Sequence, residues 1–206
     1  PSTLTSRNNL AHAYYTAGDL ERAIPLYEAT LTQREQVLGV HHPDTLTSRN
    51  NLAGAYESAG DLERAIPLYE ATLTQHEQVL GVHHPSTLTS RNNLAHAYYT
   101  AGDLERAIPL YEATLAQHEQ VLGENHPSTL NSRNNLAHAY YTAGDLERAI
   151  PLFEATLTQR EQVLSENHPD TLNSRNNLAR ARELAPPVQQ LNTATPAINA
   201  SGQSPR

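Results

Sequence analysis

Residues 43–84 read PDTLTSRNNLAGAYESAGDLERAIPLYEATLTQHEQVLGVHH, and closely similar stretches begin at Pro1, Pro85, Pro127 and Pro169. The chain therefore repeats every 42 residues, with four complete copies and a fifth that stops about half-way through. A fixed period of this length is typical of a solenoid, in which each unit packs mainly on its neighbours. The pattern indicates an extended binding surface rather than a catalytic pocket.

Each unit is predicted to form two helices. In the first unit, a helix runs from about Ser2 to Thr16 and ends at Gly18, because glycine is a common C-terminal stop. Asp19 caps a second helix, which continues to about Leu38 and ends at Gly39. Apolar residues recur at helical spacing, at Leu10, Ala13, Tyr14 and Ala17 in the first helix and at Leu20, Ala23, Ile24, Tyr27, Leu31 and Leu38 in the second.

Pro25 lies inside the second predicted helix, where a proline removes one backbone hydrogen bond and can cost ~3 kcal/mol. It shares a polar stripe with Glu21, Glu28, Thr32 and Glu35, which we expect to face solvent. Water can then satisfy the carbonyl of Glu21, and the helix is expected to bend modestly at this point.

Composition narrows the classes of function. Among 206 residues there is no Cys and no Lys, and the formal net charge is −8. These features argue against disulfides, thiolate metal sites and nucleic-acid partners. No apolar run approaches the ~18 residues of a membrane span and no signal peptide is present, so we expect a cytoplasmic protein. The start at Pro1 without Met suggests an excised fragment or a processed chain.

The run N-N-L-A-x-A-Y-x-x-A-G-D-L-E-R-A-I-P-L-Y-E resembles the tetratricopeptide repeat. The 42-residue length and the H-P-[DS]-T-L linker resemble the kinesin-light-chain type, and similar repeats are common in actinobacterial proteins. The resemblance covers residues 1 to about 184, with matches at Leu10, Ala11, Tyr14, Gly18, Ala23 and Tyr27. Two positions depart from the family pattern: Arg7 lies where many such repeats have a large apolar residue, and Thr30 lies where they usually have a small Ala.

The expected fold is all-α, a right-handed α-α superhelix of tetratricopeptide repeats. Its repeats cover residues 1–42, 43–84, 85–126 and 127–168, and a half repeat covers 169–185. Residues 186–206, rich in Pro, Thr, Ser and Asn, are expected to be disordered or a linker. The resemblance implies that the first helices of the repeats line a concave groove that holds a peptide or a partner protein, and that the domain is not an enzyme.

The copies differ mainly on one face of the first helix of each repeat, which the family pattern assigns to the groove. Variation there indicates a recognition surface. The predicted partner-binding residues are Asn8, Asn9, His12, Tyr15, Asn50, Asn51, Glu57, Asn92, Asn93, His96, Tyr99, Asn134, Asn135, His138, Tyr141 and Asn176.

The chemistry of these residues suits an extended peptide. Paired Asn side chains offer donors and acceptors to a peptide backbone, although one Asn of each pair could instead bond a neighbouring helix. Tyr15, Tyr99 and Tyr141 are flat contact surfaces, or else pack on their own helices. Glu57 interrupts this aromatic row, so groove preference should change in the second repeat. The groove histidines lie too far apart to share a metal ion, and we expect no metal and no cofactor.

Two further sets of side chains have alternative interpretations. The linker pairs His41–His42 and His83–His84 could chelate a metal, but capping of the next helix is favoured. Arg7, Arg49, Arg91, Arg133 and Arg175 could bind an acidic peptide, but we favour ion pairing, for example of Arg49 with Glu35.

The last copy is more polar than the others. Arg180 and Arg182 replace the histidine and tyrosine of earlier copies, as expected of a helix that caps an open solenoid end. The leading hypothesis is a non-enzymatic protein-interaction module; the alternative is a structural array that self-associates into a homo-oligomer or filament. Enzymatic function is disfavoured, because no catalytic triad, phosphate-binding loop or convergent metal site is found.

Overall fold

The computed structural model describes residues 2–185, and this part of the chain forms nine α-helices. They are α1 (Ser2–Thr16), α2 (Leu20–Leu38), α3 (Pro43–Ser58), α4 (Leu62–Leu80), α5 (Pro85–Thr100), α6 (Leu104–Leu122), α7 (Pro127–Thr142), α8 (Leu146–Leu164) and α9 (Pro169–Leu184). The segment predicted to be disordered or a linker lies outside the described residues.

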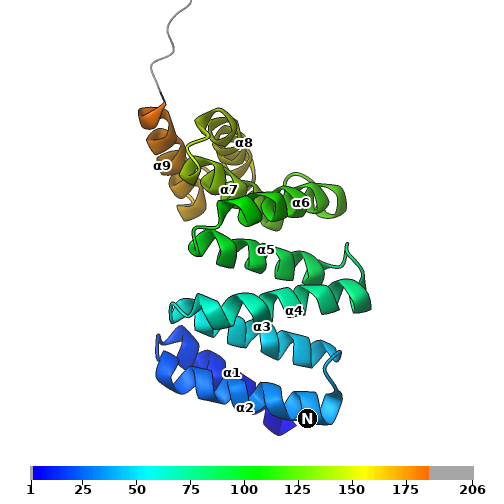
Figure 1. The fold of residues 1–206 in the computed structure, drawn as a ribbon. Helices are drawn as coiled ribbons and strands as arrows, with labels where there is room; N and C mark the ends of the chain where they lie inside the picture. Colours follow the sequence, from blue (N-terminus) through cyan, green and yellow to red (C-terminus); the bar gives the residue numbers. More distant parts are fainter. Residues whose placement is uncertain (1, 186–206) are drawn as a thin grey trace, which may run out of the picture.

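The helices stack in sequence order, from α1 and α2 at one end to α9 at the other (Figure 1). Each helix packs mainly against the helices before and after it, which makes four two-helix repeats and one additional helix. This arrangement confirms the predicted all-α repeat fold. The odd-numbered helices are the first, or A, helices of the repeats, and the even-numbered ones are the B helices.

Local signals determine the helix ends as predicted. Gly18, two residues after the last residue of α1, adopts a φ of 77°, a conformation that glycine tolerates. The Asp19 carboxylate then accepts a hydrogen bond from the backbone N–H of Arg22 and caps α2. The linker histidines cap as well, since Nδ1 of His42 accepts the backbone N–H of Asp44 at 3.1 Å. Capping was the favoured interpretation, and the same contact recurs before α5, α7 and α9.

The core consists mainly of alanine, leucine and tyrosine side chains, but not every residue of the predicted apolar stripes is buried: Leu10, Ala13 and Ala17 of α1 are exposed. Ala23 and Tyr27 of α2 are buried, as are the matching residues of later repeats. Leu10 is 48% exposed, whereas its equivalent Leu52 is only 4% exposed. The prediction that Leu10 is buried was wrong, because the described chain has no B helix in front of α1 to cover it.

The two residues that looked unfavourable have simple explanations. Pro25 is exposed within α2, as predicted. Thr30 is fully buried, and its hydroxyl donates to the carbonyl oxygen of Leu26 one turn earlier at 2.6 Å. Thr30 therefore fits a tight core position because its only polar atom is satisfied locally.

Candidate functional site

The predicted Asn ladder exists, and its members bond to one another. From the second repeat on, the second Asn of each pair donates to the first Asn of the preceding repeat, as Asn93 Nδ2 does to Asn50 Oδ1 at 3.1 Å. The equivalent distances lie between 3.3 and 3.4 Å for Asn51–Asn8, Asn135–Asn92 and Asn177–Asn134. Each bond uses one of the two amide N–H donors, so every ladder amide keeps hydrogen-bonding capacity. Asn9 and Asn176 are exposed.

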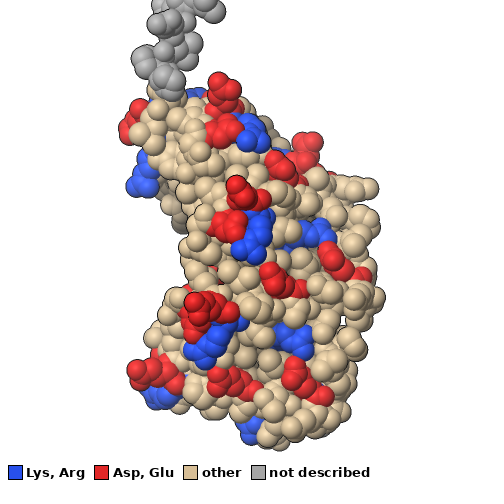
Figure 2. Space-filling view, in the orientation of Figure 1, with Lys and Arg blue, Asp and Glu red and all other residues tan. Residues whose placement is uncertain are grey.

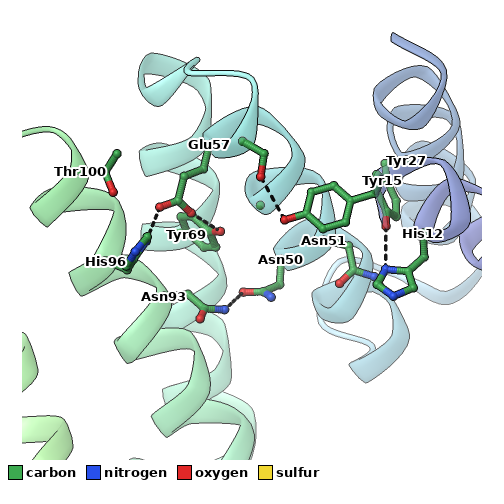
Figure 3. A pocket seen from close by; sticks show the side chains of 12 residues that line it. His12, Tyr15, Tyr27, Asn50, Asn51, Glu57, Tyr69, Asn93, His96 and Thr100 are labelled. Carbon is green, nitrogen blue, oxygen red and sulfur yellow. Dashed lines mark hydrogen bonds and ion pairs between the residues drawn. The ribbon is translucent and has the colours of Figure 1, made fainter. Parts of the chain in front are cut away.

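A cavity of about 510 Å³ opens between the first three A helices (Figure 3). We name it the central cavity. Most of its wall comes from α1, α3 and α5, with one tyrosine each from α2 and α4. Its lining residues are His12, Tyr15, Tyr27, Asn50, Asn51, Gly54, Glu57, Ser58, Tyr69, Asn93, His96 and Thr100. The structure thus brings predicted site residues from three repeats around one space.

Glu57 lies at one side of the central cavity, with its side chain 14% exposed (Figure 3). Its Oε2 accepts the hydroxyl of Tyr69 at 2.9 Å, and its Oε1 lies 2.6 Å from Nδ1 of His96. The hydrogen bond to Glu57 raises the pKa of His96, while burial raises the pKa of Tyr69 so that it stays a donor. Three side chains from α3, α4 and α5 therefore form one polar cluster.

The other groove histidines have different partners. Nδ1 of His12 lies 3.4 Å from the hydroxyl of Tyr27. His138 packs edge-on against Phe153 at 5.1 Å and lies 3.0 Å from Nδ2 of Asn177. Burial lowers the pKa of His138, and Arg180 adds to this effect. The three histidines share a sequence position but not a chemical environment.

Two of the three predicted tyrosines connect neighbouring A helices, and the third packs on the B helix of its own repeat. The hydroxyl of Tyr15 lies 3.0 Å from Ser58 Oγ, and that of Tyr99 lies 2.9 Å from Thr142 Oγ1. Tyr141 contacts Phe153 edge-on at 6.5 Å. A second cavity of about 150 Å³ lies beside the last two tyrosines, and it is lined by Tyr99, His138, Tyr141, Thr142, Phe153, Asn177 and Arg180.

The arginine row is structural, as the favoured interpretation predicted. Arg49 is 6% exposed and bonds Glu35 of the preceding B helix and Gln75 of the following one, both at 2.7 Å. Arg91 and Arg133 repeat this arrangement. Arg7 bonds Gln33 alone within the described residues. Arg175 bonds Glu161 of the preceding B helix at 2.7 Å, with its side chain 46% exposed. The three buried members, Arg49, Arg91 and Arg133, hold successive helices together and are not presented to an acidic ligand.

Sequence reasoning missed a polar position that is buried between repeats. Arg34, His76, His118 and Arg160 occupy it in successive copies and are 5–7% exposed. Each contacts a serine of the next A helix, as His76 Nδ1 does Ser90 Oγ at 2.7 Å. Burial lowers the pKa of His76 and of His118. The presence of Arg in two copies and His in the other two, at one position of the repeat, was the available signal.

Aromatic, acidic and basic side chains also join each repeat to the next. Tyr56 donates to Glu28 of the preceding B helix, and the guanidinium of Arg64 lies 4.1 Å above the Tyr56 ring. In the last repeat Arg182 takes the tyrosine position and bonds Glu154 directly at 2.7 Å. Basic and acidic atoms are accordingly interleaved on the face shown in Figure 2, without a large patch of one sign.

The structure shows no metal-binding chemistry in the part it describes. Over residues 2–185, no three or more His, Cys, Asp or Glu side chains gather closely enough to hold a metal ion. Among the described helices, none is long and apolar enough to cross a membrane.

Comparison with protein families identifies the class of this protein. The chain matches the tetratricopeptide repeat over residues 2–74, 50–116, 100–161 and 140–185, and it therefore belongs to this family. Such repeats are typically non-enzymatic and generally serve as protein-interaction modules. No curated protein matches the sequence.

Solved structures narrow the resemblance to the kinesin-light-chain type. A kinesin light chain from Podosopora anserina with nearly identical TPR-like repeats is 34% identical, with a TM-score of 0.79; the match covers 89% of this chain and 87% of that one. A structure of a substituted form of the same protein is 34% identical over the same shares, with a TM-score of 0.80. BtubC (BKLC) from P. vanneervenii is 26% identical, with a TM-score of 0.75 and coverage of 85% and 70%.

Proposed function

We propose that this chain is a non-enzymatic scaffold that binds an extended peptide or a segment of a partner protein along the groove formed by its A helices. The observation that carries the proposal is the central cavity, where polar and aromatic side chains of three repeats surround about 510 Å³. Unused amide donors of the Asn ladder can bond a peptide backbone, and tyrosine rings provide contact area. The repeats supply a rigid, preformed surface, which reduces the entropic cost of binding.

The test is a binding measurement on peptides selected from a random library displayed against the chain. Fluorescence anisotropy of a labelled selected peptide should show roughly tenfold weaker binding for Asn51→Ala and for Asn93→Ala, since each removes amide contacts in the central cavity. Gln120→Ala is the matched control, because it deletes an exposed amide on α6 outside both cavities. Unchanged affinity in both Asn variants, with unfolding midpoints like that of the parent, argues against groove binding.

A second candidate function is self-association, and the exposed face of α1 favours it. Residues 1–16 and 85–100 have the same sequence, yet the α5 copy packs on α4 while Leu10 of α1 remains 48% exposed. Two such faces can pair about a two-fold axis. Light scattering at increasing concentration tests this: a mass that stays at 22.7 kDa excludes self-assembly, and a rising mass that Leu10→Glu abolishes supports it.

A further inference from the structure

We propose that the central cavity is a specificity pocket for one cationic side chain, Arg or Lys, of an extended peptide, with the Glu57 carboxylate as its partner. This inference rests on the proposed function and adds a chemical preference at one place in the groove. Both the space and the charge arise because the second repeat departs from the others.

The space comes from Gly54. It takes the position of His12, His96 and His138, so the second repeat has no imidazole there. A Cβ at Gly54 would lie 3.4 Å from the hydroxyl of Tyr69, and a ring beyond it would project into the central cavity. The second cavity retains His138 and measures only about 150 Å³. Loss of the ring therefore leaves room for a ligand side chain.

The charge comes from Glu57, at the position that Tyr15, Tyr99 and Tyr141 hold in other repeats. It is the single acidic residue among the residues that line the central cavity, where the basic side chains are His12 and His96 and there is no Arg or Lys. With 14% of its side chain exposed, Glu57 is partly removed from water. A carboxylate in such a place attracts a cation more strongly than one in bulk solvent.

Glu57 also keeps free acceptor sites for a ligand. Its two oxygens each have one partner, Tyr69 on Oε2 and His96 on Oε1, whereas a carboxylate offers about four acceptor sites. A guanidinium or ammonium group can therefore add to the existing pair. The Tyr15 ring on the wall offers an aromatic surface, and this chain already places a cation 4.1 Å over a ring at Arg64 and Tyr56.

Selection of peptides from a random ten-residue library tests the preference. The parent chain is compared with Gly54→His/Glu57→Tyr, which gives the second repeat the residues of the first, third and fourth and so preserves the repeat pattern. Glu63→Gln is the control for net charge, since Glu63 is exposed on α4 and does not line the cavity. We expect Arg or Lys to be enriched roughly tenfold at one position for the parent and for Glu63→Gln, and not for the double variant.

A double-mutant cycle then assigns the contact. In the best selected peptide, the basic residue is replaced by citrulline for Arg or norleucine for Lys, and affinity is measured for the parent and for Glu57→Gln. Each change alone should weaken binding roughly tenfold, and the two together should weaken it little further. Independent effects that multiply would show that the basic residue binds elsewhere and would overturn the assignment.

The outcomes separate this inference from the proposed function. Selected peptides without a basic position, or with the same basic position in the double variant, overturn the cationic pocket and leave peptide binding intact; Glu57 would then serve only to join the second and third repeats. A failure to select any peptide on any variant removes both proposals.

Discussion

Replacement of Arg91 by Met tests whether the buried arginine row stabilises the stack. Met keeps an apolar stem but removes the guanidinium, which is 6% exposed and bonds Gln117 at 2.6 Å and Glu77 at 2.7 Å. Loss of a charge-assisted bond to Gln117 costs about 1.5–3 kcal/mol. The Glu77 side chain is 36% exposed, so that ion pair adds only about 0–1 kcal/mol. The expected loss of unfolding free energy is about 2–4 kcal/mol.

The chain contains its own control for this experiment. Arg7 occupies the same place in an identical local sequence but, among the described residues, bonds only Gln33. Because Arg7 is also less buried, Arg7→Met should cost about 0.5–1 kcal/mol. Urea unfolding, followed by circular dichroism, measures the loss of unfolding free energy for each variant. The dependence of that free energy on urea concentration should be the same in the parent and in both variants. Equal losses for the two variants would refute the argument that burial and the bridge to Glu77 make Arg91 important.

Three further predictions concern single positions. Ser165 holds a φ of 95° where earlier repeats have glycine, so Ser165→Gly should raise the unfolding free energy by about 0.5–1 kcal/mol in urea titrations, and a loss would contradict the strain argument. Burial lowers the pKa of His76 and His118, so their contribution to stability is complete above the unfolded-state pKa and is lost as pH falls below it. A variant with Arg at both positions should therefore lose less unfolding free energy than the parent between about pH 7 and about pH 5. Equal losses would refute this. Glu57→Gln should lower the pKa of His96 in an NMR titration, since its main raising partner is gone; an unchanged pKa would mean that the contact is absent in solution.

Features set by neighbours in the chain, and one contact that recurs with the repeat, were predictable from sequence. The cap at Asp19 and the stop at Gly18 depend on neighbours in the chain, and the helix ends are confirmed there. The Arg49–Glu35 pair was also predictable, since successive helices must pack in a solenoid and the two residues recur with the repeat.

Other features that depend on the relation between repeats were not predicted. The burial of His76 against Ser90 follows from how α4 meets α5, which no periodicity within one helix reveals. The exposure of Leu10 follows from what precedes α1 rather than from its own sequence. Sequence reasoning recognised that Glu57 interrupts the aromatic row, but not that it meets Tyr69 and His96 from two other helices.

The Asn ladder has a consequence for where a peptide can sit. A ligand that contacts only ladder amides finds the same groups in every repeat, so it can shift by one repeat without losing a bond. About three equivalent registers add RT ln 3, roughly 0.6 kcal/mol, to affinity but leave the bound position undefined. Among the four complete repeats, only the second has an acidic residue at this position, Glu57. A basic side chain at a given place in the peptide would therefore meet it in a single register, and this one exception would give an otherwise periodic surface a unique alignment.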